Sequence, residues 1–284
     1  MKHRPDTLSP FIIFLFMLFY NQDNKRLFEN TEKDIFCMEF PGLAQYSSLR
    51  HRVFTRKGGT SEKPFDSLNI SYSVGDVKKK VDANTGIISC SIGAQKLAHM
   101  DQVHGRTVVS FKKNKSPYKG NIPEADGIIT DIPGLALMVK QADCQGVILF
   151  DPVKKVVSAV HSGWKGSVKN IIGKTVEKMT KDFNCLPENI AAAIGPSLGP
   201  CCGEFISYKK IFPSSFNRFM VKENYFDFWS ISESQLTDAG LRPENIEKAG
   251  ICTRCSTDMF FSYRGEGKTG RFATIAMIKD RNMS

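Results

Sequence analysis

Residues 146–183 read GVILFDPVKKVVSAVHSGWKGSVKNIIGKTVEKMTKDF, and their hydrophobic pattern changes from strand-like to helical along the segment. Two apolar runs, Gly146–Phe150 and Val156–Val160, are separated by the turn signal Asp151-Pro152, which is typical of neighbouring strands. A helical pattern follows, because apolar residues recur three or four positions apart with lysines opposite them. These apolar residues are Val168, Ile171, Ile172, Val176, Met179 and Phe183. The stretch therefore predicts two strands followed by an amphipathic helix.

The same alternation of apolar runs and turn signals continues on both sides of this stretch. Further strand candidates are His51–Thr55, Thr107–Phe111, Gly127–Thr130 and Leu135–Lys140. Residues 78–92 form a weak amphipathic helix candidate, and Pro-Glu-Asn-Ile occurs twice, each time between a helix candidate and a short strand candidate. That repeat marks two similar helix-to-strand crossings or arises by chance. Helices among runs of neighbouring strands predict an α+β fold, a single layered domain with a mixed β-sheet flanked by helices.

The N-terminal segment differs from the rest of the chain. Residues 11–20 read FIIFLFMLFY and follow Lys2, His3 and Arg4, like the basic and apolar regions of a signal peptide. The run is too short to span a bilayer as a helix, and no small-residue cleavage pattern follows it. We interpret residues 1–44 as an N-terminal extension and residues 45–284 as the catalytic domain. A signal peptide with an unusual cleavage site and a membrane-proximal anchor are the alternatives.

Charge and cysteine usage narrow the class of protein. The 284 residues carry a net charge of +10, which suits an anionic ligand, nucleic acid or an acidic membrane, but also a plain lysine-rich surface. The basic residues form no long run and no Arg-Gly repeat, so we expect no nucleic acid partner. Eight dispersed cysteines are typical of a reducing compartment, so we expect a cytoplasmic protein. The oligomeric state is left open.

Three residues lie at strand ends, where functional sites are commonly formed. His104 and His161 each lie in a polar, glycine-containing segment after a strand candidate, and Cys144 lies at the junction of two strands. Two imidazoles and one thiolate could form a zinc site whose fourth position is open. Their separations of 40 and 17 residues match no local metal-binding spacing. A Cys–His nucleophile pair and simple packing therefore stay open as alternatives.

Four further cysteines form two short motifs. Cys252 and Cys255 form a C-x-x-C motif, and Cys201 and Cys202 are adjacent. No second C-x-x-C motif exists to complete a zinc ribbon, and the motif does not sit at a strand-to-helix turn. We predict structural roles for both pairs, with neither Cys252 nor Cys255 acting as a metal ligand. One ion held by all four cysteines is the minor alternative.

Seven motifs in a fixed order make the chain recognisable. They are QVHG (102–105), ADGIIT (125–130), ADC (142–144), HSGWKG (161–166), IGPSLGPCC (194–202), CT (252–253) and FFSYRGEGKTGR (260–271). Together they resemble the YfiH/YlmD family, once called laccase-domain or multicopper polyphenol oxidase proteins and now described as purine nucleoside phosphorylases with adenosine deaminase activity. The resemblance covers roughly residues 50–280. It implies a YfiH-like α+β fold and a zinc site formed by His104, Cys144 and His161.

The resemblance also implies an activity. It is zinc-dependent phosphorolysis of adenosine, inosine and 5′-methylthioadenosine, together with deamination of adenosine, so purine nucleosides and phosphate are the expected partners. Cys144, His161 and Asp143 fall on the expected catalytic segments, with Asp143 assigned to proton transfer. From motif position and charge we place Arg56, Lys165 and Arg264 near phosphate, and Asn69 near the sugar or base. Lys165 departs from the family's usual Arg, so it keeps the charge and loses the planar fork.

Different chemistry at the same residues defines three competing functions. A copper-dependent polyphenol oxidase needs several copper centres with many histidine ligands, and this chain has five histidines. Copper at the His-Cys-His residues could still support weak oxidation, so zinc is the expected cofactor and copper the alternative. A hydrolase with Cys144 as nucleophile is the second competing function, and a binding module without turnover is the third.

Overall fold

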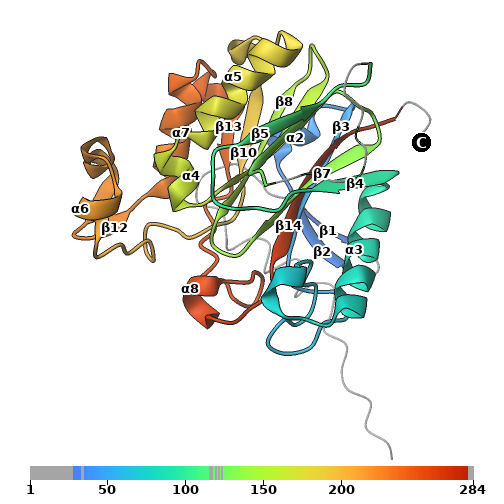
Figure 1. Cartoon of the computed structure of the whole chain (residues 1–284), viewed down its shortest axis with the longest axis horizontal. Helices are drawn as coiled ribbons and strands as arrows, with labels where there is room; N and C mark the ends of the chain where they lie inside the picture. Colours follow the sequence, from blue (N-terminus) through green and yellow to red (C-terminus); the bar gives the residue numbers. More distant parts are fainter. Residues whose placement is uncertain are drawn as a thin grey trace, which may run out of the picture.

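The computed structural model describes residues 28–32, 35–114, 118, 120, 122 and 124–280. Its centre consists of two six-stranded sheets with helices on their outer faces (Figure 1). The first sheet has the order β1 (Phe28–Glu32), β2 (Ile35–Glu39), β3 (Leu49–Phe54), β14 (Phe272–Ile278), β7 (Leu135–Gln141) and β4 (Lys96–His99). The second has the order β13 (Ile246–Lys248), β10 (Ala191–Ile194), β8 (Gln145–Asp151), β9 (Val156–Ser162), β6 (Gly127–Thr130) and β5 (Val108–Phe111). The expected α+β class with mixed sheets is confirmed, and the strands divide into two sheets.

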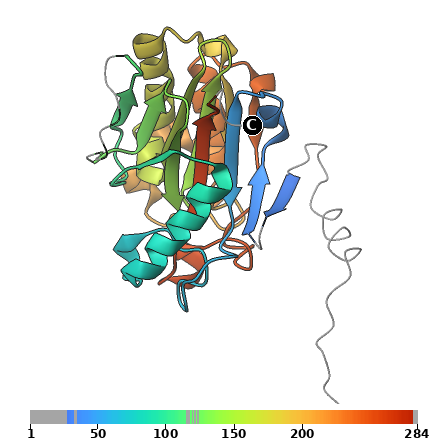
Figure 2. The same ribbon diagram turned by 90° about the vertical axis from the view of Figure 1, so that its right-hand side faces the viewer.

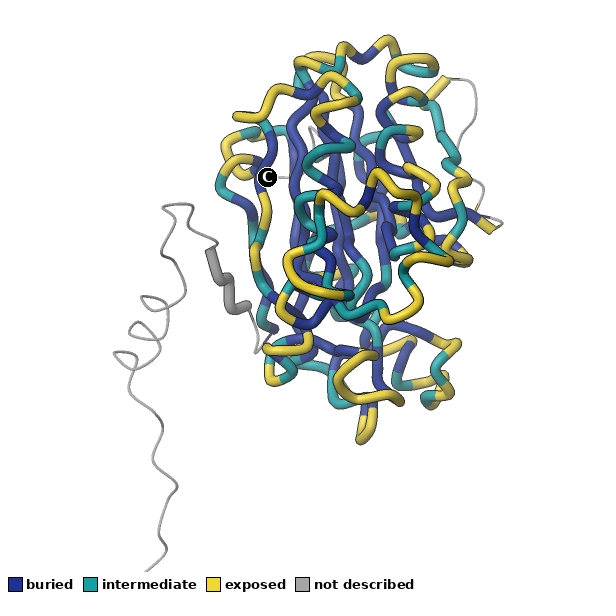
Figure 3. Tube along the Cα trace, turned by 90° about the vertical axis from the view of Figure 1, so that its left-hand side faces the viewer, coloured by how far each residue is buried: buried dark blue, intermediate teal, exposed yellow. Residues whose placement is uncertain are grey.

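The two sheets pack against each other through a shared apolar core. Val53 and Val139 of the first sheet and Ile148 and Phe150 of the second are fully buried in one cluster. Figure 3 shows this buried centre as a continuous set of strands beneath exposed loops. Burial of whole strands explains why β8 contains the apolar run Gly146–Phe150 and why β9 is apolar from Val156 to Val160 except at Ser158.

Helices cover the outer face of each sheet. Helix α3 (Lys78–Ile92) lies against the first sheet, where Ile88 and Ile92 pack in a cluster with residues of β7 and β14 (Figure 2). Helices α5 (Ile171–Phe183) and α7 (Phe228–Asp238) cover the second sheet. The sequence predicts one helix from residue 168 to 183, but α4 (Trp164–Val168) ends before α5 begins. Asn170 separates them with a left-handed φ of 52°, and its side chain caps α5.

Shorter elements complete the part of the chain that the structure describes. They are α2 (Pro41–Ala44), α6 (Tyr208–Ile211), α8 (Tyr263–Glu266), the strand pair β11 (Met220–Lys222) and β12 (Tyr225–Phe226), and the 3₁₀ turns η1 (Tyr72–Val74), η2 (Pro187–Asn189), η3 (Ser214–Phe219) and η4 (Pro243–Asn245). The two Pro-Glu-Asn-Ile repeats form η2 and η4 and lead into β10 and β13, which are parallel neighbours. The repeat therefore marks two similar crossings onto the same sheet edge.

The folded unit begins before residue 45, which corrects the boundary expected from sequence. Strand β2 pairs with β3, and Phe40 and Leu43 are each 1% exposed. The Phe40 N–H donates to Nε2 of the buried His51 at 2.8 Å, which ties this segment to the core. A five-residue strand without a flanking repeat carries little sequence signal, so the sequence pattern places it in the extension. The apolar run at residues 11–20 lies outside the described residues, and none of the described helices has the length and apolarity to cross a bilayer.

Candidate active site

Strand pairing places two of the predicted ligands side by side. In the β8–β9 ladder Gln145 lies opposite Ser162 and Gly146 opposite His161, so Cys144, just before β8, reaches His161. His104 approaches from the loop that follows β4 and has a left-handed φ of 56°. The neighbouring sheets therefore bring together residues that are far apart in the sequence.

The three side chains converge on one point. Cys144 Sγ and His104 Nε2 are 3.7 Å apart, and the two imidazole rings lie edge to face with centroids 4.8 Å apart. The ligand atoms of His104, Cys144 and His161 all lie within 4.8 Å of one another. We call these residues the His–Cys–His cluster. Because ligands about 2.0–2.3 Å from a shared zinc ion are separated by less than 4.8 Å, the donor set fits such an ion.

Asp126 supports this cluster and is the principal residue that sequence reasoning missed. Its carboxylate is fully buried, and Oδ1 lies 2.8 Å from His161 Nδ1. The same carboxylate accepts the backbone N–H groups of His104 at 3.0 Å and Gly105 at 2.6 Å. A carboxylate on one imidazole nitrogen leaves the other nitrogen directed at a metal. The signal was present, because Asp126 belongs to the ADGIIT motif directly before β6.

Electrostatics couple the cysteine to its histidine. Burial opposes ionisation of Cys144, yet His161 and His104 outweigh it and lower the pKa of the thiol to about 6. Burial also disfavours the charged form of His161, but Cys144 and Asp126 raise the pKa of its imidazole. The thiolate form of Cys144, which binds metals and acts as a nucleophile, is therefore favoured near neutral pH.

Asp143 has a different environment from the one expected of a proton-transfer residue. One carboxylate oxygen accepts hydroxyl hydrogen bonds from Thr253 at 2.7 Å and Ser262 at 2.6 Å, and the other accepts the Arg264 N–H at 2.6 Å. Its own φ is 81°, a conformation that few non-glycine residues adopt. Asp143 therefore fastens two C-terminal loops beside Cys144, and its oxygens are occupied by donors of this chain.

The cations expected to bind phosphate lie in different surroundings. Lys165 is exposed, and its Nζ lies 5.5 Å from the Trp164 ring centroid. Arg264 is exposed as well and donates to the Glu204 carbonyl at 2.9 Å. Lys169, which was not selected from the sequence, donates to the His104 carbonyl at 3.5 Å. The basic residues around the His–Cys–His cluster thus include one that sequence reasoning left out.

Asn69 is a buried structural residue, which differs from its expected role in binding sugar or base. It is 0% exposed, and its amide nitrogen donates to Ser71 and Asp76. Its Oδ1 accepts the Arg271 N–H at 2.9 Å, so Asn69 positions the Arg271 backbone. Burial lowers the pKa of Arg271, while the charges of Cys144 and Asp143 oppose that shift. Its Nη1 group donates to the carbonyls of Thr269 at 3.0 Å and Gly270 at 2.8 Å. Arg271 is the last residue of the FFSYRGEGKTGR motif and was not selected there.

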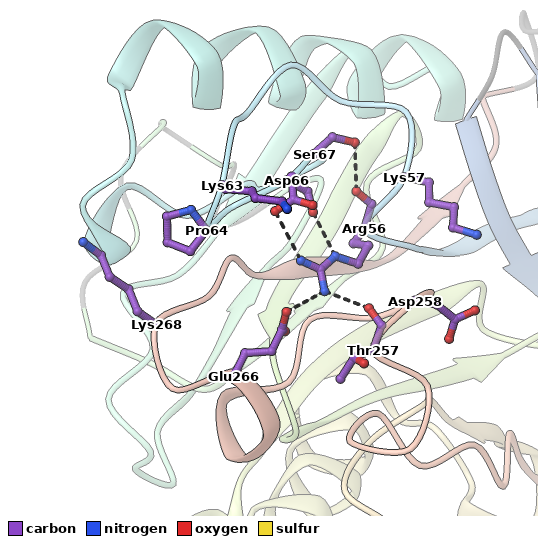
Figure 4. A pocket seen from close by; sticks show the side chains of 10 residues that line it. All are labelled: Arg56, Lys57, Lys63, Pro64, Asp66, Ser67, Thr257, Asp258, Glu266 and Lys268. Carbon is purple, nitrogen blue, oxygen red and sulfur yellow. Dashed lines mark hydrogen bonds and ion pairs between the residues drawn. The ribbon is translucent and has the colours of Figure 1, made fainter.

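Arg56 lies in a separate pocket of about 560 Å³ (Figure 4). Its guanidinium donates to Glu266 at 2.7 Å and to the carbonyls of Thr257 and Asp66, and it stacks on Phe261. The lining comprises Arg56, Lys57, Lys63, Pro64, Asp66, Ser67, Thr257, Asp258, Glu266 and Lys268, so no ligand of the His–Cys–His cluster contributes to it. The charge of Arg56 is therefore matched by carboxylates of the chain itself, unlike the free phosphate-binding cation that was expected.

The remaining cysteine motifs also meet. The structure brings Cys201, Cys202, Cys252 and Cys255 together, with all four Sγ atoms within 4.8 Å of one another. The sequence-based reason for assigning Cys252 and Cys255 no metal was the lack of partner ligands, and that reason does not hold in the fold. The thiols of Cys201, Cys202, Cys252 and Cys255 form no disulfide.

The fold and the His–Cys–His cluster define a layered α+β protein with a candidate three-ligand metal centre. A family model described as "Multi-copper polyphenol oxidoreductase laccase" matches residues 50–279, and the chain belongs to this laccase-domain family, which the YfiH/YlmD resemblance indicated. The family description implies a bound metal, and the His–Cys–His cluster is a candidate site for one.

Named relatives and solved structures agree with this assignment. Over 242 residues the chain is 31% identical to "Purine nucleoside phosphorylase YlmD" of Bacillus subtilis, covering 80% of this chain and 87% of that protein. It is 33% identical to a purine nucleoside phosphorylase of Deinococcus radiodurans, over 86% of this chain and 96% of the other. The crystal structure of YlmD from Geobacillus stearothermophilus superposes with a TM-score of 0.79 at 26% identity, covering 89% of this chain and 99% of that one.

Proposed function

We propose that this chain is a zinc-dependent purine nucleoside phosphorylase that cleaves adenosine, inosine and 5′-methylthioadenosine and also deaminates adenosine. The observation that carries the proposal is the convergence of His104, Cys144 and His161 within 4.8 Å, in a chain similar to named purine nucleoside phosphorylases. Three protein ligands of this kind suit a zinc ion with an open position. When bound, zinc supplies Lewis-acid polarisation of a substrate atom.

The chain's own residues hold the ligands in place. Asp126 fixes the His161 ring and the His104 backbone from a fully buried position, so both ligands are oriented before substrate arrives. Asp143 ties Cys144 to the loops carrying Thr253 and Arg264. Such preorganisation lowers the reorganisation needed in the transition state.

Phosphate requires cations beside this centre. We assign Arg271 the main phosphate contact, because the charges of Cys144 and Asp143 act on its guanidinium. Its Nη1 group donates to the carbonyls of Thr269 and Gly270, so the Nε and Nη2 edge is the part that would bind phosphate. Lys165, on the first turn after His161, supplies a second, exposed charge. Arg264 stays a candidate at the same rim, while Arg56 and Asn69 act as structural residues. The free thiols support a reducing, cytoplasmic location.

The test is a product assay on zinc-loaded protein. Adenosine and inosine are incubated with and without phosphate, and ribose 1-phosphate, free bases and inosine are measured. Phosphate-dependent ribose 1-phosphate with adenine or hypoxanthine supports phosphorolysis, and inosine formed from adenosine without phosphate supports deamination. Failure to form ribose 1-phosphate from either nucleoside overturns the main proposal.

One observation favours a second candidate, a hydrolase with Cys144 as nucleophile. Cys144 Sγ lies 3.7 Å from His104 Nε2, and its pKa is lowered, as an activated thiol requires. Zinc and a nucleophilic role for this thiol exclude each other, since the same sulfur would serve both. Activity that survives chelation and is lost to iodoacetamide would select the hydrolase. Activity restored by copper and not by zinc would select an oxidase.

A further inference from the structure

Two turns on neighbouring strands bring four cysteines to one place. Cys201 and Cys202 lie in the turn after β10, and Cys252 and Cys255 lie in the turn after β13. Strands β10 and β13 are parallel neighbours, and a bridge between Ser197 and Cys252 extends that pairing into the turns. The sheet therefore places next to each other cysteines that are 50 or more residues apart, Cys201 and Cys255 being separated by 54.

The spacing of the sulfur atoms is that of ligands around one ion. Cys255 Sγ lies 3.6 Å from Cys201 Sγ and 3.5 Å from Cys202 Sγ, and the four Sγ atoms lie within 4.8 Å of one another. Four thiolates at about 2.3 Å from a tetrahedral zinc ion are separated by about 3.8 Å. A disulfide would need about 2.05 Å, and the four thiols are free.

The backbone around Cys252 directs two N–H groups at its sulfur. The Gly199 N–H donates to Cys252 Sγ at 3.3 Å, and the Cys255 N–H donates to the same sulfur. Gly199 packs so closely that an added Cβ would lie 2.9 Å from the Cys252 Cβ and 2.8 Å from Trp229, so the two turns are held together by contact. Backbone N–H groups directed at a sulfur stabilise its thiolate, the form that binds metals.

We propose that Cys201, Cys202, Cys252 and Cys255 bind one zinc ion as a four-coordinate structural site, separate from the His–Cys–His cluster. We call these residues the four-cysteine cluster. Four soft sulfur ligands select zinc among the common cellular divalent ions and leave no open position for a substrate. Cys202 and Cys252 are buried while Cys201 and Cys255 are exposed, so an ion has a path from solvent.

The ion would fasten the loop that supports the candidate active site. Thr253, between the two cysteines of the second turn, donates to the Asp143 carboxylate at 2.7 Å, and the Leu198 N–H donates to the Asp143 carbonyl at 2.9 Å. Both turns of the four-cysteine cluster thus hold the residue that precedes Cys144. This site stabilises the fold around the His–Cys–His cluster and takes no part in the reaction itself.

Zinc content tests the proposal independently of activity. Full-length protein produced with zinc is compared with the double variant Cys201→Ser/Cys255→Ser, with Cys90→Ser as the control for an exposed cysteine outside both clusters. The wild type and Cys90→Ser should hold about two zinc ions per chain and the double variant about one. His104→Ala should retain the ion of the four-cysteine cluster. Equal zinc in the double variant and the wild type overturns the proposal.

X-ray absorption on the wild type covers the case in which the double variant fails to fold. Two sites with four and one sulfur ligands give an average of about 2.5 sulfur neighbours per zinc, whereas the His–Cys–His cluster alone gives about one. An average near one overturns the proposal, as does iron in place of zinc. A disulfide among the four cysteines, detected as a mass about 2 Da lower in non-reduced protein, overturns it as well.

Discussion

The His–Cys–His cluster and the four-cysteine cluster both lie where loops leave the sheets, but they differ in ligand number and in the groups behind the ligands. His161 is backed by the buried Asp126 carboxylate, and the set of three ligands is open. Cys252 is backed by backbone N–H groups, and the set of four is closed. Open and closed ligand sets separate a metal centre that can act on a substrate from one that can only stabilise. Substitutions in each cluster test that division.

We call the His–Cys–His cluster the open cluster and the four-cysteine cluster the closed cluster. The largest expected effect is loss of activity on removing a ligand of the open cluster. His104→Ala should lower kcat/KM for phosphorolysis by about 10³-fold or more, because Lewis-acid stabilisation worth several kcal/mol is lost. Steady-state assays with inosine and phosphate measure this. Cys201→Ser in the closed cluster is the matched control and should keep most of the activity. Comparable losses in both variants would contradict the division.

The two clusters should also differ in thiol reactivity after zinc removal with a chelator. Cys144 has a pKa lowered to about 6 by its histidines, whereas burial and the neighbouring thiols raise the pKa of Cys201. At pH 7 Cys144 is mainly thiolate, so iodoacetamide should modify it about 100-fold faster even after allowance for its lower intrinsic nucleophilicity. The Cys144 rate should fall below pH 6, while the Cys201 rate should keep rising to pH 9.

Accessibility alone predicts the opposite order, because Cys201 is exposed and Cys144 is half-buried. Peptide mass mapping of alkylated protein distinguishes the two explanations. Faster labelling of Cys201 at pH 7 would show that exposure, not ionisation, separates the clusters.

Sequence patterns located the elements well where burial covers a whole strand or a helix face. The expected strand Gly127–Thr130 and the expected helix at residues 78–92 match β6 and α3 in both bounds. Strand β2 was missed, because it is short and is held in place by its antiparallel pairing with β3, which the local sequence pattern does not show. The hydrophobic pattern also could not predict that the strands divide into two sheets, because contacts between residues distant in the sequence determine which strands pair.

The site shows the same limit. His104, Cys144 and His161 were identifiable from side-chain chemistry and motif, whereas Asp126 and Arg271 lie within recognised motifs and were not selected. Asn69 was placed near the sugar or base from its position among the motifs, but the side chain is fully buried and bonds within the chain. A metal at the four cysteines was discounted because the sequence shows no second C-x-x-C motif, and only the pairing of β10 with β13 brings the two pairs together.

Removing the closed cluster should affect stability more than turnover. Cys201→Ser/Cys255→Ser should lower the free energy of unfolding by about 3 kcal/mol, as expected for loss of a structural metal, and Tm by roughly 6–12 °C. Phosphorolysis at 25 °C should stay within about fivefold of the wild type. Differential scanning calorimetry and activity of the same preparation measure both. An unchanged Tm with strongly reduced activity would reverse the assignment of the two clusters.

Substitution of Asp126, whose carboxylate orients His161 in the open cluster, should have an intermediate effect on zinc affinity or activity. Asp126→Asn removes the charge that orients His161 while keeping the shape, so zinc affinity or kcat/KM should fall by about 10–100-fold. Competition with a zinc chelator and initial rates measure the two effects. Asp182→Asn is the control. Asp182 lies on α5 and also accepts a side-chain hydrogen bond, in this case from Ser110 of β5 at 2.7 Å. Equal effects of the two substitutions would remove Asp126 from the centre.

The smallest effect concerns an exposed cation on α4, the helix that follows the His161 ligand of the open cluster. Lys165 lies four residues after His161, is exposed, and makes no ion pair among those of the described residues, so its charge is available to an anion. Losing a contact to a charged group costs roughly 1.5–3 kcal/mol, so Lys165→Ala should lower phosphate-dependent kcat/KM about tenfold with zinc retained. Lys174→Ala is the control, because Lys174 is exposed on α5 and pairs with Glu177 at 2.6 Å. A phosphate titration unchanged by Lys165→Ala would leave Arg271 to bind the anion without it.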